Sequence, residues 1–564
     1  NTTGGNNVAV GRSALQANTT ASNNTAVGYQ SLLANTTGTE NSALGRYSLY
    51  TSTTGAYNTA VGTNALFAST TSSFNTALGS NALFANTTAD NNTAVGKSAL
   101  AANTTGASNV AVGALALDAN TTASQNTAVG YNALTATTTG AANTAVGFEA
   151  LDANTTAANN VGIGWRALYA NTTGTQNTAI GTDSLKANTT GTGNTASGYR
   201  SLFTNTSASF NTAMGQVALA LNTTGASNTA FGYKSLEANT TGGQNVAVGD
   251  NALGANTTAD YNTAVGTSAL LRNTTGTQNV SIGAFTLDTN TTGGGNVALG
   301  YQALRVNTTA SNNTGVGHKA LTANTTGGDN TALGRDALGA NTTASNNTAL
   351  GRMSLLSNTT GAGNTGVGLS ALRNNTTAAN NTAVGMQALN INTTGASNVA
   401  VGNDALYANT TASNNTAVGK SALAANTTGH SNTAFGQGAG DSITTGTGNT
   451  LIGLGADTTA VDSANTVVLG VNVQGATNYT TLGNGSNDIR AAHGNVTWAT
   501  VSDQRYKKDI VDSTAGLSFI NALQPRTFKY KTLGELPETF SAYEADSTEV
   551  FKNSNTNHGF IAQE

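Results

Sequence analysis

The sequence repeats itself with a period of 17 residues over most of its length of 564 residues. The glycine of the phrase N-T-A-V-G recurs at this interval from Gly11 to Gly453, which gives 27 copies without an insertion or deletion. If the Asn four residues before that glycine is position one, a representative copy runs N-T-A-V-G-Y-Q-S-L-L-A-N-T-T-G-T-E, from Asn24 to Glu40. A fixed period kept through 27 copies indicates one structural unit stacked many times.

Some positions of the copy are constant and others vary. Position one is Asn in all 27 copies, position nine is Leu in the first 25, and position four is apolar apart from Ser197. Positions six, seven and ten vary among residues such as Tyr, Arg, Lys, Asp and Thr. We therefore expect the constant positions, position four included, to face inward and the variable positions to face solvent. Representative residues of the expected internal ladders are Asn24, Asn41, Asn58, Leu32, Leu49 and Leu66.

The composition of the copy favours strands over helices. Asn, Thr and Gly fill each copy, and they weaken helical hydrogen bonding or compete with it. The T-A-V and A-L pieces suit two short strands, separated by a turn at the glycine and a longer N-T-T-G turn. Neighbouring coils would pair in parallel about 4.8 Å apart, with the Asn of position one stacked in a ladder. The sequence thus predicts an all-β fold, a parallel β-solenoid of 17-residue repeats over residues 1–470.

The expected core of one coil is thin. It holds one Leu, one Val-sized residue and an Ala or Ser, and each large side chain contributes about 2 kcal/mol on burial. A second buried face, shared with identical chains around a threefold axis, would add the missing burial, and closed symmetric assemblies are common. We therefore expect a homotrimer.

The phrase N-T-A-V-G followed by A-L resembles the YadA-like head repeats of trimeric autotransporter adhesins, which form left-handed parallel β-rolls. The resemblance covers about residues 1–470. The copy is longer than the usual coil of that family, and N-T-T-G fills the extra turn. The resemblance implies a trimeric β-roll shaft and names no enzyme.

The character of the sequence changes near Ser486. Both prolines, Pro525 and Pro537, lie beyond this point, and residues 486–564 hold 18 of the 48 charged residues of the chain. We expect a small, separate α+β domain over residues 501–564. Residues 471–500, which contain alternating stretches, are expected to form a β-rich neck between the solenoid and this domain.

Four phrases follow one another in the C-terminal region. They are S-D-Q-R-Y-K from Ser502, G-L-S-F-I-N-A-L-Q-P from Gly516, F-K-Y from Phe528 and G-F-I-A-Q-E from Gly559. In this order they resemble the intramolecular chaperone domain of phage tail fibres and tailspikes, known from endosialidases. That family folds and trimerises its fibre and then cuts itself away. It continues after G-F-I-A-Q-E with a largely helical segment, so the resemblance implies an incomplete domain at Glu564.

The resemblance also implies a catalytic site. The cut would fall between Val501 and Ser502, with Ser502 as the nucleophile and Lys507 as the general base. The other matching positions, which would shape or orient the site, are Asp503, Arg505 and His558. A lysine can accept the serine proton only if burial lowers its pKa well below the usual value. The alternative is a helix N-cap at Ser502 or Asp503, with the lysines in solvent.

Composition argues against several functional classes. Charged residues make up only 9 % of the chain, the net charge is -4 and no basic run occurs, so nucleic acid is not an expected partner. No stretch approaches the roughly 20 apolar residues that span a bilayer, and no export leader precedes the first repeat. The chain has no Cys and its four His are isolated, so neither a metal site nor a cofactor is expected.

These patterns predict a structural fibre protein, a homotrimeric phage tail fibre or a fibre of a related injection apparatus. Its expected location is the virion tail fibre or, more generally, extracellular, and its partner would be a host surface receptor, with a glycan as one candidate class. The alternative is a bacterial cell-surface trimeric adhesin. An enzyme acting on a glycan would need paired carboxylates in a cleft, and no such pair is identifiable.

An ice-binding β-solenoid is a minor alternative. Ice-binding faces need Thr at i and i+2 on one side of a strand, whereas the two Thr of N-T-T are adjacent and would point to opposite faces. We interpret the N-T-T triplets as turn residues rather than as glycosylation sites. Positions six, seven and ten show no concentrated aromatic or charged patch along the sequence. Trp165 is therefore interpreted as incidental, and residues 471–500 are the candidate segment for receptor binding.

Overall fold

The computed structural model describes residues 1–485, 488–494, 499–500, 526–540, 542–552 and 557–559. The chain divides into two compact units, Asn1–Ala499 and Thr500–Glu564. Among the described residues the regular structure consists of β-strands and one short 3-10 helix. The prediction of an all-β chain is confirmed for this part.

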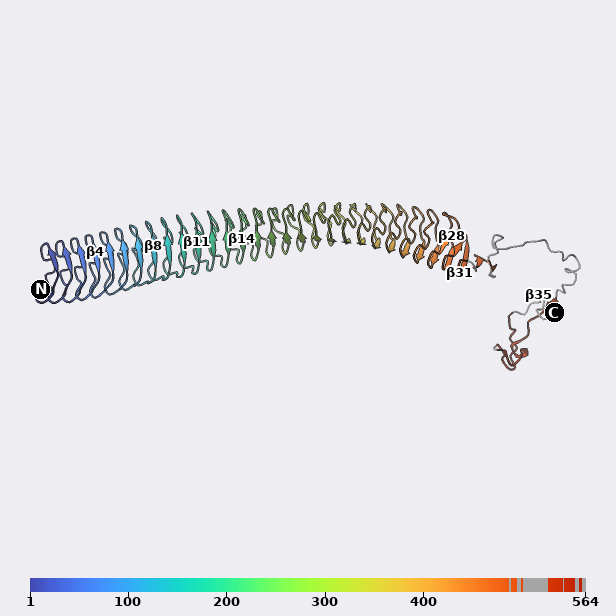
Figure 1. Cartoon of the computed structure of the whole chain (residues 1–564), viewed down its shortest axis with the longest axis horizontal. Helices are drawn as coiled ribbons and strands as arrows, with labels where there is room; N and C mark the ends of the chain where they lie inside the picture. Colours follow the sequence, from blue (N-terminus) through green and yellow to red (C-terminus); the bar gives the residue numbers. More distant parts are fainter. Residues whose placement is uncertain (486–487, 495–498, 501–525, 541, 553–556, 560–564) are drawn as a thin grey trace. The chain divides into compact units, whose positions relative to one another are not determined.

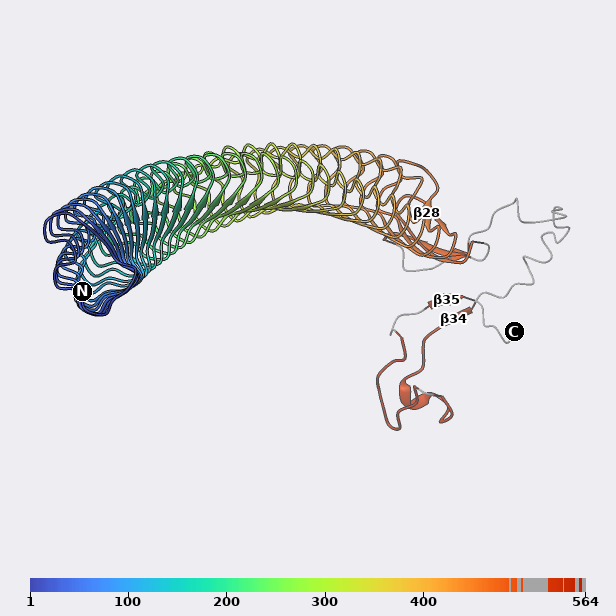
Figure 2. The ribbon, with the colours of Figure 1, turned by 60° about the vertical axis from the view of Figure 1, so that its left-hand side comes forward.

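The first unit is a parallel β-solenoid with one strand in each coil, and Figure 1 shows its coils stacked along one axis. Strand β1 is Val8–Val10, and each later strand begins 17 residues after the one before it, through β27 at Thr450–Ile452. Every strand covers positions two to four and pairs in parallel with the strand of the next coil, so Ala26 aligns with Ala43. Figure 2 shows successive coils following the same outline.

The second strand that the A-L piece predicts is not formed in the described coils. Leu32, at position nine, has a left-handed φ of 51°, and Gln30, at position seven, has a φ of 54°. The N–H of Leu32 donates to the carbonyl oxygen of Ser48 in the next coil at 2.8 Å. A left-handed Leu costs about 1–2 kcal/mol, which the burial of its side chain, about 1.5–3 kcal/mol, offsets. The chain therefore turns at positions seven and nine, where the A-L piece of the sequence predicted a strand.

The core contains small side chains and one Leu per coil. In the fourth coil Ala60, Ala65 and Leu66, at positions three, eight and nine, are fully buried. Because side chains alternate along a strand, an inward position three sends positions two and four outward. The expectation that the apolar residue of position four lies in the core is therefore wrong.

Two ladders of buried Asn side chains run along the solenoid. At position one, the Asn58 backbone N–H donates to Oδ1 of Asn41 at 3.0 Å, and Asn58 Nδ2 donates to the Ser72 carbonyl oxygen at 2.8 Å. At position twelve, Asn120 Nδ2 donates to Oδ1 of Asn103 at 2.8 Å. The four Asn side chains are fully buried. Their hydrogen bonds provide partners for polar groups that are buried in the thin core and would otherwise be unpaired. The Asn of N-T-T, at position twelve, acts as a turn residue.

The glycine of position five turns the chain after each strand. Gly130 has a φ of 139°, which L-residues with a side chain rarely adopt. A Cβ atom at this position would also overlap the carbonyl oxygen of Gly147 in the next coil. Glycine is thus required both by the backbone conformation and by the spacing of the coils.

The repeat becomes irregular at the C-terminal end of the solenoid. The strands that follow β27 are β28 (Asp457–Thr458), β29 (Val467–Gly470), β30 (Gln474–Gly475), β31 (Tyr479–Gly483), β32 (Ile489–Ala492) and β33 (Ala499–Thr500). Strands β29 and β31 continue the parallel sheet, and β28 pairs with β30. Strand β32 then runs antiparallel to β31, so the parallel stacking ends there.

The described part of the second unit is small. Strands β34 (Arg526–Phe528) and β35 (Asn557–Gly559) pair in an antiparallel manner. Between them lies the 3-10 helix η2 (Leu533–Glu535). The backbone N–H of Thr532 donates to the carboxylate of Glu535 at 2.9 Å, and this hydrogen bond lowers the pKa of Glu535.

We predict that Gly130→Ala destabilises its own coil and the coils on either side by at least about 2 kcal/mol, because it adds backbone strain and an atomic overlap. A solenoid is nearly one-dimensional, so the measurement is amide hydrogen exchange in the three coils around the substituted residue, which are residues 109–159 for Gly130→Ala, rather than a global melting curve. Gly328→Ala is the control, since its Cβ would lie 3.3 Å from the nearest atom, the Ser311 carbonyl oxygen. Equal exchange rates in the two variants would contradict this account of position five.

Candidate interaction surfaces

The outward side chains of strands β1 to β27 form a continuous surface, which we call the strand face. Position two is Thr or Val in every one of these strands except β3, where it is Ser42, and position four is apolar except for Ser197. No charged residue occurs at either position. Large apolar side chains are exposed here, including Leu44 at 49 %, Phe231 at 52 % and Phe435 at 57 %.

The strand face is large enough to form a stable interface. With about 4.8 Å per coil and about 7 Å between side chains two residues apart, it measures about 130 Å by 7 Å, on the order of 900 Å². Monomeric soluble proteins rarely expose continuous apolar patches of more than a few hundred Å². A standard protein interface buries about 800 Å² on each partner. The strand face, in which a row of apolar side chains at position four runs beside a row that is mostly Thr at position two, therefore has the area of a surface that another molecule covers.

The threonines of the solenoid lie in two different environments. Those of position two lie on the strand face beside an apolar residue at i+2, so the strands do not present Thr at both i and i+2. Those of the N-T-T turn bind neighbouring coils, as Thr104 Oγ1 donates to the carbonyl oxygen of Thr121 at 3.0 Å. Neither arrangement matches the paired Thr rows that ice binding requires.

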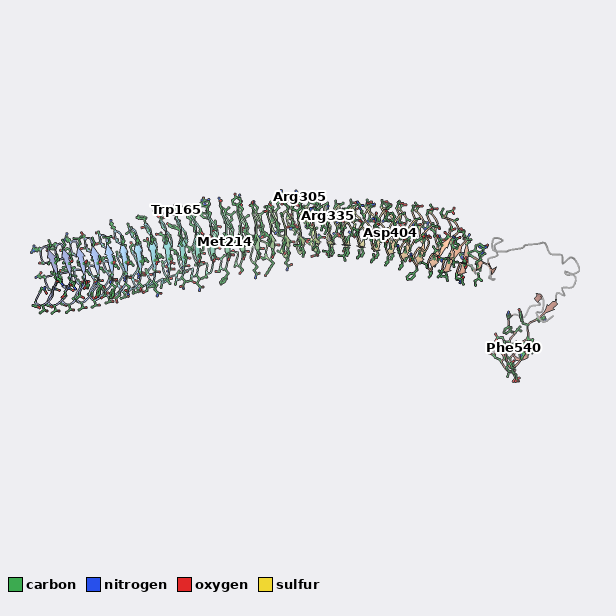
Figure 3. The ribbon with its side chains drawn as sticks, viewed as in Figure 1. Trp165, Met214, Arg305, Arg335, Asp404 and Phe540 are labelled. Carbon is green, nitrogen blue, oxygen red and sulfur yellow. The ribbon has the colours of Figure 1, made fainter. Side chains whose placement is uncertain are left out.

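A second surface appears when position six is followed from coil to coil. Five exposed aromatic rings fall within seven consecutive coils, and we call them the aromatic strip: Tyr131, Phe148, Trp165, Tyr199 and Tyr233. The ring centroids of Tyr131 and Phe148 lie 5.5 Å apart, and those of Phe148 and Trp165 lie 6.5 Å apart, with nearly parallel planes. Figure 3 shows Trp165 projecting from the edge of the solenoid. The interpretation that positions six, seven and ten carry no concentrated patch is therefore wrong.

Charged side chains of positions seven and ten surround the strip. Arg166 Nε lies 2.7 Å from Glu149 Oε2, and the Arg166 guanidinium carbon lies 4.6 Å from the centroid of the Trp165 ring. Lys186 Nζ lies 2.9 Å from Asp183 Oδ1 and 5.6 Å from the Trp165 ring centroid. The cations are thus held by a carboxylate on one side and by an aromatic ring on the other.

The pKa values of the acidic groups reflect partial burial. Burial raises the pKa of Asp118, and burial together with the nearby Glu149 raises the pKa of Asp152. The hydrogen bond with Glu149 raises the pKa of Arg166. The Arg166 guanidinium therefore keeps its positive charge at neutral pH.

Other clusters of side chains are smaller or packed on one another. Near the N-terminal end, the Tyr50 and Phe67 rings stack with centroids 5.1 Å apart. At the irregular end, Asp457 takes the position that Leu occupies in the regular coils, and burial raises its pKa. Its carboxylate accepts the backbone N–H groups of Ser442 and Thr458. In the described parts of the chain no group of three or more His, Cys, Asp or Glu side chains could hold a metal ion.

The candidate segment 471–500 carries one contact between a cation and a ring in its described part. The Arg490 guanidinium carbon lies 5.4 Å from the Tyr479 ring centroid. Thr480 Oγ1 and His493 Nε2 lie 3.2 Å apart. This cluster is small beside the aromatic strip, which the sequence analysis did not identify.

Most of the predicted catalytic residues lie outside the described residues. These are Val501, Ser502, Asp503, Arg505 and Lys507. His558 lies in β35, where its backbone pairs with Thr527 of β34. In the same pairing Phe528 lies opposite Asn557 and Arg526 opposite Gly559.

Comparison with known families bears on the second unit. Residues 502–564 match the Peptidase_S74 family, the chaperone of endosialidase. No curated protein and no solved structure matches the chain. In the described residues, no helix has both the length and the apolar character needed to cross a membrane. A long β-solenoid followed by a chaperone segment of the endosialidase type is an architecture like that of a tail fibre.

Proposed function

We propose that this chain is the shaft of a homotrimeric phage tail fibre, or of a fibre in a related injection apparatus. The shaft holds the virion's host-binding surfaces away from the particle, and the C-terminal chaperone segment folds and aligns the three chains. The observation that carries the proposal is the strand face, which is uncharged along 27 coils and lies on the N-terminal side of a region, residues 502–564, that matches the chaperone of endosialidase.

The three strand faces meet around the threefold axis in this proposal. Val, Leu, Ile and Thr side chains of one chain then pack on those of the other two, which adds the burial that a single coil lacks. The Asn ladders and the small core stay within each chain. Each chain thus keeps its own coil structure and gains stability from the shared face.

The chaperone segment is proposed to set the register in which the three chains align. Since 27 coils are nearly identical, three chains that are shifted by one coil make almost the same contacts as chains in register. Local contacts therefore cannot select the correct register. A C-terminal segment that associates first fixes the alignment at one end, after which the solenoids associate coil by coil.

Release of the chaperone follows as a Ser-Lys peptide cleavage. The Ser502 hydroxyl attacks the carbonyl carbon of Val501 while neutral Lys507 takes its proton. The peptide nitrogen of Ser502 leaves with a proton, and water then hydrolyses the ester that joins the Val501 carbonyl to the Ser502 oxygen. The products are a shaft ending at Val501 and a free chaperone segment.

Lysines on the strand face are expected to prevent assembly. The triple variant Met214→Lys, Val265→Lys and Ile282→Lys places three charges in each chain on the proposed interface, where burial of an unpaired charge is costly. We expect sedimentation to show monomers or aggregates instead of trimers. The control variant carries Gln216→Lys, Thr267→Lys and Ala284→Lys, which add the same charges to the same coils at position six. A trimer from the strand-face variant would rule out this face as the interface.

Cleavage is tested by mass. We expect the protein expressed from its complete gene to give a native mass of three chains that end at Val501, and Ser502→Ala to give uncut chains. Native and denaturing mass spectrometry measure both quantities. Trimers of uncut chains from the unsubstituted gene would support the proposed trimeric fibre but contradict the proposed cleavage. A soluble monomer would contradict the trimeric fibre.

Deletion of residues 486–564 tests the alignment role. We expect the truncated chain to give staggered or aggregated assemblies, because nothing then fixes the register. Electron microscopy measures the distribution of rod lengths, with the uncleavable Ser502→Ala protein as the control. Uniform trimers of native length from the truncated chain would be incompatible with the proposed role.

A further inference from the structure

We propose that the aromatic strip binds an extended, uncharged polysaccharide that lies along the solenoid axis. The strip comprises the position-six rings of Tyr131, Phe148, Trp165, Tyr199 and Tyr233. This inference deepens the proposed role in host attachment by naming the class of ligand. It rests on the proposed fibre in one respect, which is that the aromatic strip must remain exposed when the chains assemble.

The buried core does not require aromatic rings at position six, although neighbouring rings stack on one another. Thr182 and Gln216 take position six in two coils within the strip, and their backbones follow the same course as those of the aromatic coils. The rings contribute little to the core, since Trp165 remains 41 % exposed and the other four are exposed to a similar extent. Five exposed rings in seven consecutive coils therefore point to contact with another molecule.

The dimensions of the strip suit a linear ligand. From Tyr131 to Tyr233 the chain advances six coils, or about 29 Å at about 4.8 Å per coil. The rings follow one line because position six repeats at the same place in each coil. A polymer lying parallel to the solenoid axis could contact all five rings, whereas a small molecule could contact only one or two.

The charges around the strip favour an uncharged polar ligand. Four cations, Arg166, Lys186, Arg200 and Lys234, are matched by four carboxylates, Glu149, Asp152, Asp183 and Glu237. Three of the cations form ion pairs, including Lys234 with Glu237 at 3.5 Å. The region thus has no net charge, and it lacks the excess of positive charge by which proteins hold nucleic acids.

Sugars combine the two properties that the strip offers. The rings of Tyr131, Phe148 and Trp165 stack face to face along the axis, so a polymer on this line meets their exposed edges. A sugar ring offers these edges an apolar C–H surface, and its rim of hydroxyl groups donates and accepts hydrogen bonds. The paired charges provide both donors and acceptors. They are also held in place, because the Arg200 guanidinium carbon lies 5.4 Å from the Tyr199 ring centroid and 4.8 Å from that of Phe203. Ordered side chains lose less conformational freedom on binding.

The first experiment is affinity electrophoresis of the full chain in native gels that contain dextran, mannan or hydroxyethylcellulose. Dextran sulfate serves as the charged comparison. The chain has two tryptophans, Trp165 and Trp498, so the Trp498→Phe variant reports on Trp165 alone. We expect at least one of the uncharged polymers to retard the protein and to change Trp165 fluorescence in this variant.

The matched variants change aromatic rings on and off the strip. We expect the double variant Trp165→Ala and Tyr199→Ala to bind the retarding polymer at least about tenfold more weakly, from the loss of two ring contacts. The control carries Tyr57→Ala and Phe74→Ala, another exposed stacked pair whose centroids lie 5.1 Å apart at a different position of the coil. It should bind as the unsubstituted chain does.

Several results would overturn the inference. These are no retardation by any uncharged polymer, retardation by dextran sulfate alone, and equal loss of binding in the strip and control variants. Sedimentation of the same samples separates this inference from the proposed fibre. If the protein is a monomer that binds polysaccharide through Trp165, the binding site is supported and the trimer is contradicted. If it is a trimer that binds no polysaccharide, the fibre is supported and the binding site is contradicted.

Discussion

The hydrogen bond between equivalent residues of adjacent coils is the interaction on which the solenoid depends. An Asn of position one accepts a backbone N–H from the next Asn, as in Asn41 and Asn58, and the strands pair at the same interval of 17 residues. A change in the length of one coil would disturb this alignment between that coil and its neighbours. The uniform period is therefore a physical requirement of the ladders, and side chains can vary freely only where no neighbouring coil needs them.

The sequence predicted the period, the parallel stacking and the strand at T-A-V, because all three follow from the spacing of constant residues. It did not predict the turn at Leu32, where burial of the side chain holds a left-handed backbone. It also misplaced position four, since a constant apolar residue can face a core or an interface. The small Ala of position three gave no reason to choose it as the inward residue.

The two surfaces differ in how sequence reveals them. The strand face repeats in every coil, so its pattern can be read from each copy of the repeat. Only the structure shows that these side chains point outward. The aromatic strip exists in a few coils, and its rings lie 17 residues apart, which hides them from any window along the chain. Comparison of position six between copies would have found it. The predicted catalytic residues from Ser502 to Lys507 rest on sequence resemblance and on the family match.

The one-strand coil has a consequence for the history of the protein. Each copy ends where the next begins, and Gly, Asn and Leu recur at fixed places, so an exchange between misaligned gene copies adds or removes whole coils without creating a new kind of junction. Rod length can then change in steps of about 4.8 Å, while the C-terminal segment is untouched. Related genes are expected to differ in length by multiples of 51 nucleotides. The number of coils would then set the length of the rod in each protein.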